Sequence, residues 1–239
     1  MGQFPVLRDL QRFQGLEAAV LFSGGKDSLF ALGQALAAGV RVQHLVYAVT
    51  TVPLPHNRHL ENLPLVAEAL GLPLTIITLR QRREQASLVE GLRKLAVPLM
   101  IAGNLWLEDI HEWYEQACEH VQMRLAEPLW QRDTRQLLRD EITWGLEAII
   151  MGAEEHRMPL GWLGKVLCKD TLEDFLSDSV RFGFDPCGEY GEFHTLALRS
   201  PLHRFGLTLT GTSVEVQDLA PHAGLMHTMC GRLVRDSGP

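Results

Sequence analysis

The sequence predicts an α/β protein, in which a parallel, doubly wound sheet is followed by a smaller C-terminal α+β domain. In the first half of the chain, short apolar runs alternate with segments whose apolar residues recur at helical spacing. This alternation is typical of parallel strands joined by right-handed crossovers, with helices on both faces of the sheet. The second half mixes capped helices with a strand of alternating polar and apolar residues. We place the domain boundary between residues 1–128 and residues 129–239, and we expect a frayed tail at the end.

Four short apolar runs are the expected strands of the first domain. They are EAAVLF (17–22), VQHLVYAV (42–49), LTIITL (74–79) and PLMIAG (98–103). The first three contain enough β-branched residues to favour buried strands. Helical segments fill the gaps between the runs, and two of these segments stop at Gly39 and Gly71, which suit a helix C-cap.

From about residue 104 the alternation is lost. LEDIHEWYEQACEHVQMRLA (107–126) is expected to form one long amphipathic helix, and EPLW (127–130) a short edge strand. Asp133 is expected to cap the next helix, and DTLEDFLSDSVRFG (170–183) to form another. LTLTGTSVEVQDL (207–219) alternates apolar and polar residues like an exposed strand.

The composition limits the classes of protein that the chain can belong to. Hydrophobic residues make up 46% of the 239 residues, and no apolar run approaches the roughly 20 residues that cross a bilayer. The net charge of -7 argues against general nucleic-acid binding, which needs a basic face. The four cysteines are far apart and form no CxxC pair, which favours a reducing compartment. We therefore expect a cytoplasmic protein without a secretory signal or a membrane anchor.

The stretch SGGKDS, residues 23–28, lies where the first expected strand ends and the first helix begins. Ligands of open α/β sheets bind beyond the carboxyl ends of the strands. Two adjacent glycines let backbone N–H groups approach an anion closely, and the start of a helix adds partial positive charge. The stretch therefore predicts a phosphate site, and the expected contacts are Ser23, Gly24, Gly25, Lys26, Asp27 and Ser28.

Two charged residues of this stretch indicate what accompanies the phosphate. Lys26 offers a positive point charge, whereas bare phosphate would repel Asp27. We therefore expect Asp27 to hold a Mg²⁺ ion that the phosphate shares. A plain helix N-cap is the structural alternative. The stretch is neither a Walker A loop nor GxGxxG, so it does not indicate a dinucleotide site.

A second dense group of ionisable residues lies in CGEYGEFHT, residues 187–195. Glu189, Glu192 and His194 stand beside Gly188 and Gly191, which can bend the chain. Such a segment is typical of a loop that presents side chains to a ligand. The alternative is a turn that enters a strand.

Gly188, Gly191 and four further residues are candidates for contacts with adenine or with another substrate. His56 and Arg58 lie in a loop after the second expected strand, and Glu108 follows the fourth. Arg132 could pair with a carboxylate or a phosphate. The HExxH zinc pattern fails at His111, because the residue four positions later is a glutamate.

SGGKDS resembles the PP-loop of the N-type ATP pyrophosphatases, enzymes that cleave ATP between its α and β phosphates. PCGEYGEFHT (186–195) and EPLWQRDTRQLL (127–138) narrow the resemblance to the diphthine–ammonia ligase (diphthamide synthase) family. It extends from about residue 17 to about residue 203. It implies a sheet of the HUP, or adenine nucleotide alpha hydrolase-like, type. One departure is Tyr190, where relatives more often carry a small or amide residue.

The resemblance implies a ligase that uses ATP and Mg²⁺. A substrate carboxylate would attack the α phosphate and displace pyrophosphate, and ammonia would then attack the acyl-adenylate and release AMP. In the family, the acceptor is the diphthine side chain of translation elongation factor 2. The expected catalytic residues are Lys26, Asp27, Glu189, Glu192 and His194.

Three alternatives remain open at this stage. The same chemistry could act on a different carboxylate, or the chain could be a non-catalytic module that binds adenine nucleotides. A tRNA-thiolating PP-loop enzyme is disfavoured, because it needs paired cysteines or a cluster motif and a basic tRNA-binding face. The sequence leaves homo-oligomer formation open.

Overall fold

The computed structural model describes residues 8–52, 54–220 and 224–236. The described chain forms two compact units. The first holds the residues up to Ser23, then Asp27–Thr51 and Leu72–Gln131. The second holds Gly24–Lys26, the described residues of Val52–Gly71, and those from Arg132 onward. The expected boundary after residue 128 stays a prediction, and part of the expected tail lies outside the described residues.

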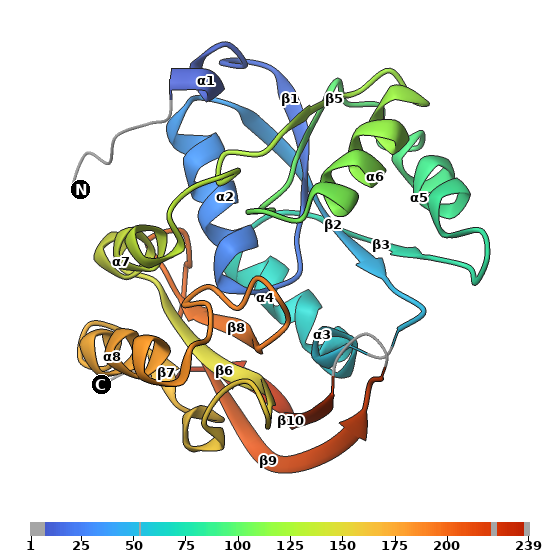
Figure 1. The fold of residues 1–239 in the computed structure, drawn as a ribbon. Coiled ribbons are helices and arrows are strands. Elements are labelled where there is room, and N and C mark those ends of the chain that lie inside the picture. The colour runs from blue at the N-terminus through green and yellow to red at the C-terminus, as the bar shows by residue number, and fades with distance from the viewer. Residues whose placement is uncertain (1–7, 53, 221–223, 237–239) are drawn as a thin grey trace. The chain divides into compact units, whose positions relative to one another are not determined.

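The first unit contains a sheet of five parallel strands in the order β3-β2-β1-β4-β5 (Figure 1). The strands are β1 (Glu17–Leu21), β2 (Arg41–Val49), β3 (Leu74–Thr78), β4 (Leu99–Ile101) and β5 (Arg124–Ala126). From β1 the chain runs outward to β2 and β3, then returns to the other side of β1 with β4 and β5. This order confirms the predicted doubly wound sheet, and it places the reversal of strand order between β1 and β4.

Helices cover both faces of this sheet, as the alternating sequence pattern predicts. They are α1 (Arg8–Gln11), α2 (Lys26–Ala37), α5 (Glu84–Leu92) and α6 (Glu108–Glu119). Figure 1 shows α2 on one face and α5 with α6 on the other. On the latter face, Leu88, Met100 and Ala117 are completely buried in one apolar cluster. Burial of such side chains stabilises the unit by roughly 1.5–3 kcal/mol each for the larger ones.

Two sequence predictions in this unit are wrong. The stretch 107–126 is not one helix, because α6 ends at Glu119 and Gln122 takes a left-handed backbone conformation (φ 59°). The residues after this turn form β5 and pair with β4. EPLW (127–130) is a turn rather than a strand, with the N–H of Trp130 donating to the carbonyl of Glu127.

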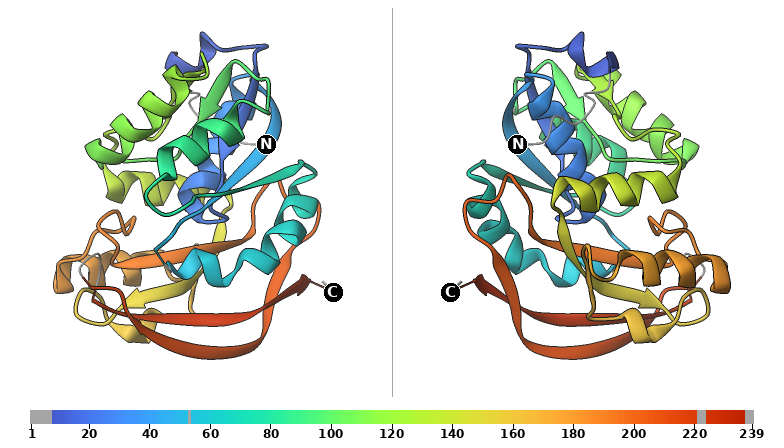
Figure 2. Two further views of the ribbon diagram at one scale, coloured as in Figure 1. Left: turned by 90° about the vertical axis from the view of Figure 1, so that its right-hand side faces the viewer. Right: turned by 90° about the vertical axis from the view of Figure 1, so that its left-hand side faces the viewer.

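The second unit contains antiparallel strands, which confirms a C-terminal α+β region. The strands are β6 (Glu147–Glu154), β7 (Val166–Leu167), β8 (Phe193–Arg199), β9 (Leu207–Asp218) and β10 (Leu225–Arg235). They pair in the order β7-β6-β10-β9, and β8 pairs with β6. Figure 2 shows the long β9–β10 pair in orange and red. The exposed strand expected at 207–219 is therefore confirmed as β9.

The helices of the second unit come from two parts of the chain. They are α3 (Pro55–Arg58), η1 (Leu60–Asn62), α4 (Leu63–Leu70), α7 (Thr134–Trp144), η2 (Leu160–Trp162) and α8 (Leu172–Phe182). The segment that contains Asn62 belongs to the second unit because the Asn62 side chain is hydrogen-bonded to β10. Its Nδ2 donates to the carbonyl of Gly231 at 2.9 Å, and its Oδ1 accepts from the N–H of Leu233 at 2.8 Å. Among the described residues, none of the helices has the length and apolar character that a membrane crossing requires.

The predicted caps of α7 are confirmed. Asp133 accepts a hydrogen bond from the N–H of Gln136 at 2.7 Å, and Gly145 closes the helix in a left-handed conformation.

We predict that Asp133→Ala lowers the free energy of unfolding by about 1 kcal/mol, because an N–H at the start of α7 loses its acceptor. Asp133→Asn keeps the acceptor and serves as the control. Equal stability of wild type and Asp133→Ala in urea denaturation would show that the cap contributes nothing.

Candidate active site

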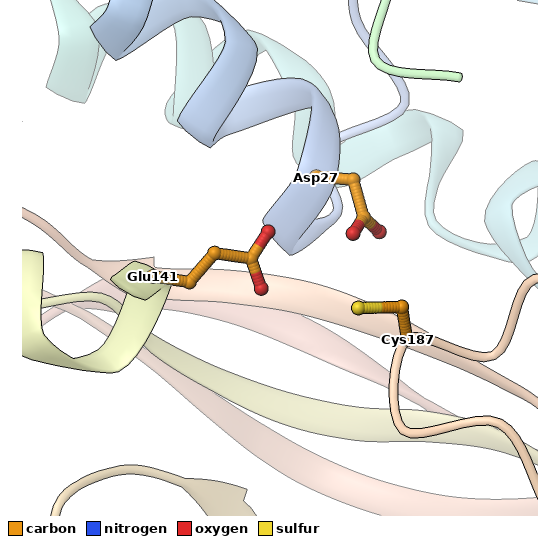
Figure 3. Close-up of side chains that lie close together, drawn as sticks. All are labelled: Asp27, Glu141 and Cys187. Atoms are coloured by element: carbon orange, nitrogen blue, oxygen red, sulfur yellow. The ribbon is translucent and has the colours of Figure 1, made fainter. Parts of the chain in front are cut away.

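The SGGKDS stretch forms a tight turn at the carboxyl end of β1. The hydroxyl oxygens of Ser23 and Ser28 lie 3.2 Å apart, and the N–H of Ser23 donates to Ser28 Oγ at 3.3 Å. Gly24 has a φ of 83°, a conformation that favours glycine. The first turn of α2 follows at once and carries Asp27 (Figure 3). The stretch therefore has the turn-to-helix geometry that the sequence predicts.

The middle of this stretch, Gly24–Lys26, belongs to the second unit and its backbone is bonded to β8 there. The carbonyl of Gly24 accepts from the N–H of Ala197 at 2.9 Å, and the N–H of Lys26 donates to Thr195 Oγ1 at 3.1 Å. A Cβ atom at Gly24 would lie 3.1 Å from a methyl group of Leu63. The conformation at Gly24 therefore favours glycine, and a Cβ atom there would also press on Leu63.

The side chain of Lys26 forms a buried ion pair with Glu141 of α7. Lys26 Nζ lies 3.5 Å from Glu141 Oε2, and both side chains are 0% exposed. Each of these buried charges has lost its hydration, so each is stabilised mainly by the opposite charge of the other. Sequence reasoning missed Glu141. A signal was present, because Glu141 lies four residues after Leu137, on the apolar face of α7.

The segment before β8 is fastened to the start of α7. Asp185 accepts from the hydroxyl of Thr134 at 2.6 Å and from the N–H of Cys187 at 2.8 Å. The thiol of Cys187 donates to the carbonyl of Thr134 at 3.2 Å. Figure 3 shows Cys187 in this loop and Glu141 on α7. The loop is therefore fixed at its first residues.

Glu192 is buried and holds the far end of the same loop. One of its carboxylate oxygens accepts from the N–H of Asp185 at 3.2 Å, and the other accepts from the N–H of Tyr190 at 3.0 Å. Gly188 and Gly191 have φ values of 74° and 82°, so both bends require glycine. This geometry favours a structural task for Glu192, while the half-buried Glu189 lies between the two bends. The catalytic roles expected for both glutamates stay predictions.

The structure brings together two predicted site residues, His56 and His194. Their rings meet edge to face, with centroids 5.0 Å apart. His194 faces Gly152 of β6, where a Cβ atom would lie only 2.8 Å from Pro55 and 3.2 Å from His194. Burial lowers the pKa of His194 to about 4, so its ring is neutral near pH 7. His194 therefore offers a neutral hydrogen-bonding ring rather than a positive charge.

The other predicted contacts are scattered over the surface of the two units. Arg58 pairs with Glu215 of β9 at 3.1 Å, and Arg132 pairs with Asp140 of α7. Glu108 is exposed on the first turn of α6. Roles for these three residues in binding substrate stay predictions.

The loop after β4 completes the edge of the parallel sheet next to SGGKDS. A Cβ atom at Gly103 would lie 3.0 Å from the carbonyl oxygen of Asp27 and 3.1 Å from the Cα atom of Ser28. The end of β4 therefore packs directly on the start of α2. Since strand order reverses between β1 and β4, this is where an α/β sheet of this type binds its ligand.

These residues fit the phosphates of ATP together with Mg²⁺. The turn at Gly24 lacks the Cβ atom that would fill it, and a helix begins directly behind it. The oxygens of Ser23, Asp27 and Ser28 are the hard donors that Mg²⁺ prefers. The sequence from strand to glycine turn to helix therefore suits an anion with its metal.

Comparison with known families agrees with this geometry. The model of the diphthamide synthase N-terminal domain matches residues 16–125, and the model of the C-terminal domain matches residues 133–225. The chain belongs to the diphthamide synthase family. Both halves of the chain thus contribute to the match, including SGGKDS and the loop before β8.

Curated members of the diphthamide synthase family are similar to most of the chain. Diphthine–ammonia ligase from Homo sapiens is 28% identical over 234 residues, covering 84% of this chain and 85% of that protein. The Danio rerio ligase is 28% identical over 228 residues, covering 82% and 87%. Among solved structures, the U34-tRNA thiolase NcsA from Methanococcus maripaludis, with its 4Fe-4S cluster, is 14% identical with a TM-score of 0.40, covering 57% of this chain and 59% of that one.

The buried pair of Lys26 and Glu141 predicts a clear pattern of stabilities. Glu141→Ala removes the carboxylate that faces a buried ammonium group and should lower the free energy of unfolding by on the order of 3–5 kcal/mol. The double variant Lys26→Met with Glu141→Leu removes both charges and should recover most of this loss. Guanidinium denaturation of the three proteins measures the effect.

Glu173→Ala is the matched control, because it breaks an exposed pair between Glu173 and Arg139 of α7. Its effect should be far smaller than that of Glu141→Ala. A double variant that is less stable than Glu141→Ala would contradict the account of a charge pair.

Proposed function

We propose that this chain adenylates a substrate carboxylate with ATP, releases pyrophosphate, and joins the acyl group to ammonia with release of AMP. Membership of the diphthamide synthase family identifies an enzyme that forms C–N bonds with the use of ATP. One observation above all supports the adenylation step. The SGGKDS turn lies at the reversal of strand order, and its backbone is bonded to β8, the strand that begins within the motif PCGEYGEFHT.

The geometry of the turn suits the departure of pyrophosphate. The start of α2 supplies partial positive charge where negative charge builds up as the bond between the α and β phosphates breaks. When bound, Mg²⁺ would neutralise part of that charge, and Asp27 would hold it. Because Gly24 and Lys26 are fastened to β8, the turn does not have to reorganise during the reaction.

The acceptor that we propose is a diphthine side chain, which the names of the relatives support. The family resemblance of the sequence motifs adds that this side chain belongs to elongation factor 2. Acting on such a protein would place the chain in the cytoplasm. In the second unit, His56, the neutral His194 and Glu189 are the groups we propose for contact with the acceptor. A different carboxylate acceptor is the remaining alternative, because Tyr190 departs from the family pattern and is 59% exposed.

A nucleotide-binding module without turnover is a second candidate. Lys26 and Glu192, two of the five expected catalytic residues, are engaged in buried contacts within the protein. A module of this kind would bind ATP and leave it intact. Product analysis separates the two candidates, since the ligase releases pyrophosphate when the acceptor is present and AMP when ammonium is added as well, whereas the module gives neither product.

The predicted role of Asp27 can be tested by removing its charge alone. We expect Asp27→Asn to slow formation of AMP by on the order of 100-fold, as for loss of one electrostatic stabiliser of a transition state. In isothermal titration, ATP without Mg²⁺ should bind this variant nearly as well as wild type, whereas ATP with Mg²⁺ should bind more weakly. Asp109→Asn makes the same change at an exposed position of α6 and should alter neither quantity. Equal turnover and equal titration curves for Asp27→Asn and wild type would exclude metal binding by Asp27.

A further inference from the structure

A carboxylate–imidazole pair stands at the carboxyl edge of the parallel sheet, at residues to which the sequence patterns assign no chemistry. Glu127 follows the last residue of β5, and its side chain is only 4% exposed. One carboxylate oxygen accepts from the amide of Asn104 at 2.6 Å, and the other accepts from Nδ1 of His111 on α6. Asn104 thus holds one oxygen of the buried carboxylate, and the other oxygen orients the imidazole ring of His111.

This arrangement determines which ring nitrogen of His111 can act as a base. A carboxylate can only accept, so Nδ1 carries the proton that Glu127 receives. In the neutral ring, Nε2 then holds a lone pair. The ring of Trp130 stacks on that of His111 at a centroid distance of 4.8 Å and fixes its plane. Since the His111 side chain is 32% exposed, a ligand can reach it.

The pair belongs to the same unit as Asp27 and Ser28. β4 and β5 are neighbours, and β4 is also the neighbour of β1. Asn104, which holds Glu127, directly follows Gly103, the residue that packs on the backbone of Asp27. The imidazole therefore belongs to the same sheet edge, beside the reversal of strand order at which ligands bind.

We propose that His111 is the base of the amide-forming step and that Glu127 is its positioning residue; this inference rests on the proposed function. His111 Nε2 takes one proton from ammonium, and the freed lone pair on nitrogen forms the C–N bond to the acyl carbon. The bond from that carbon to the phosphate oxygen of AMP breaks, and its electron pair leaves with AMP. The second proton of the nitrogen leaves on the phosphate of AMP, and the imidazolium returns its proton to water.

The chemistry of ammonia explains why such a base is useful. At neutral pH almost all ammonia is present as ammonium, which has no lone pair and cannot attack. Hydroxylamine is almost wholly unprotonated under the same conditions and attacks acyl-adenylates without a base. A variant that has lost this base should therefore react more slowly with ammonium, while its reaction with hydroxylamine keeps the wild-type rate.

The test compares these two nucleophiles in the full-length His111→Gln variant, with diphthine-bearing elongation factor 2 as acceptor. Exchange of labelled pyrophosphate into ATP, which reports adenylation alone, should stay within about twofold of wild type, while amide formation with ammonium falls by on the order of 100-fold. Formation of hydroxamate with hydroxylamine should stay near the wild-type rate. Glu127→Gln should shift the ratio of the two nucleophiles in the same direction, which a merely structural role would not do.

His120→Gln is the matched control, because His120 is an exposed histidine at the end of the same helix. It should leave all three rates unchanged. Equal losses of the ammonium and hydroxylamine reactions in His111→Gln, or a loss of pyrophosphate exchange as large as the loss of amide formation, would overturn the role of His111. Wild-type protein that shows neither exchange nor AMP would instead overturn the proposed function, and this inference with it.

Discussion

The backbone hydrogen bonds of Gly24 and Lys26 to β8 are the constraint on which the site depends. They hold the turn in a conformation that only glycine adopts easily, and a Cβ atom at Gly24 would lie in tight contact with Leu63. They also carry the side chain of Lys26 into the protein, where Glu141 must balance its charge. In the proposed function, a turn held in this way would meet phosphate without reorganising, which is what electrostatic stabilisation of a leaving pyrophosphate requires. The contact between Lys26 and Thr195 spans 169 residues and gives a physical reason for two distant motifs to occur in one chain.

The strand order of the parallel sheet is the second constraint on the site. Its strand order reverses between β1 and β4, so the turn after β1 and the loop after β4 stand side by side. The close packing of Gly103 on the start of α2 keeps them together. Beyond this junction, Glu127 and Asn104 orient His111 at the ends of the next strands. The fold thus places groups suited to phosphate and a group suited to proton transfer along one edge, which is the arrangement that a two-step ligase needs.

Features set by local sequence were predictable, whereas pairings between distant residues were not. The parallel strands and the cap at Asp133 follow from periodicity and from hydrogen bonds within four residues. The long helix expected at 107–126 was wrong, because apolar spacing continues past Glu119 although Gln122 turns the chain. Glu141 and Glu127 were missed because their partners lie far away in sequence or across a turn, and single carboxylates on helices and in turns are common. The meeting of His56 with His194 likewise depends on which strands pair, and no local pattern shows it.

The central claim is that ATP activates a carboxylate of the acceptor through its α phosphate. Labelling the acceptor carboxylate with heavy oxygen tests this claim directly, because adenylation followed by amide formation moves one carboxylate oxygen into AMP. The account predicts labelled AMP and unlabelled pyrophosphate, in amounts that match the amide formed. Recovery of ADP and phosphate, or of unlabelled AMP beside fully labelled acceptor, would contradict it.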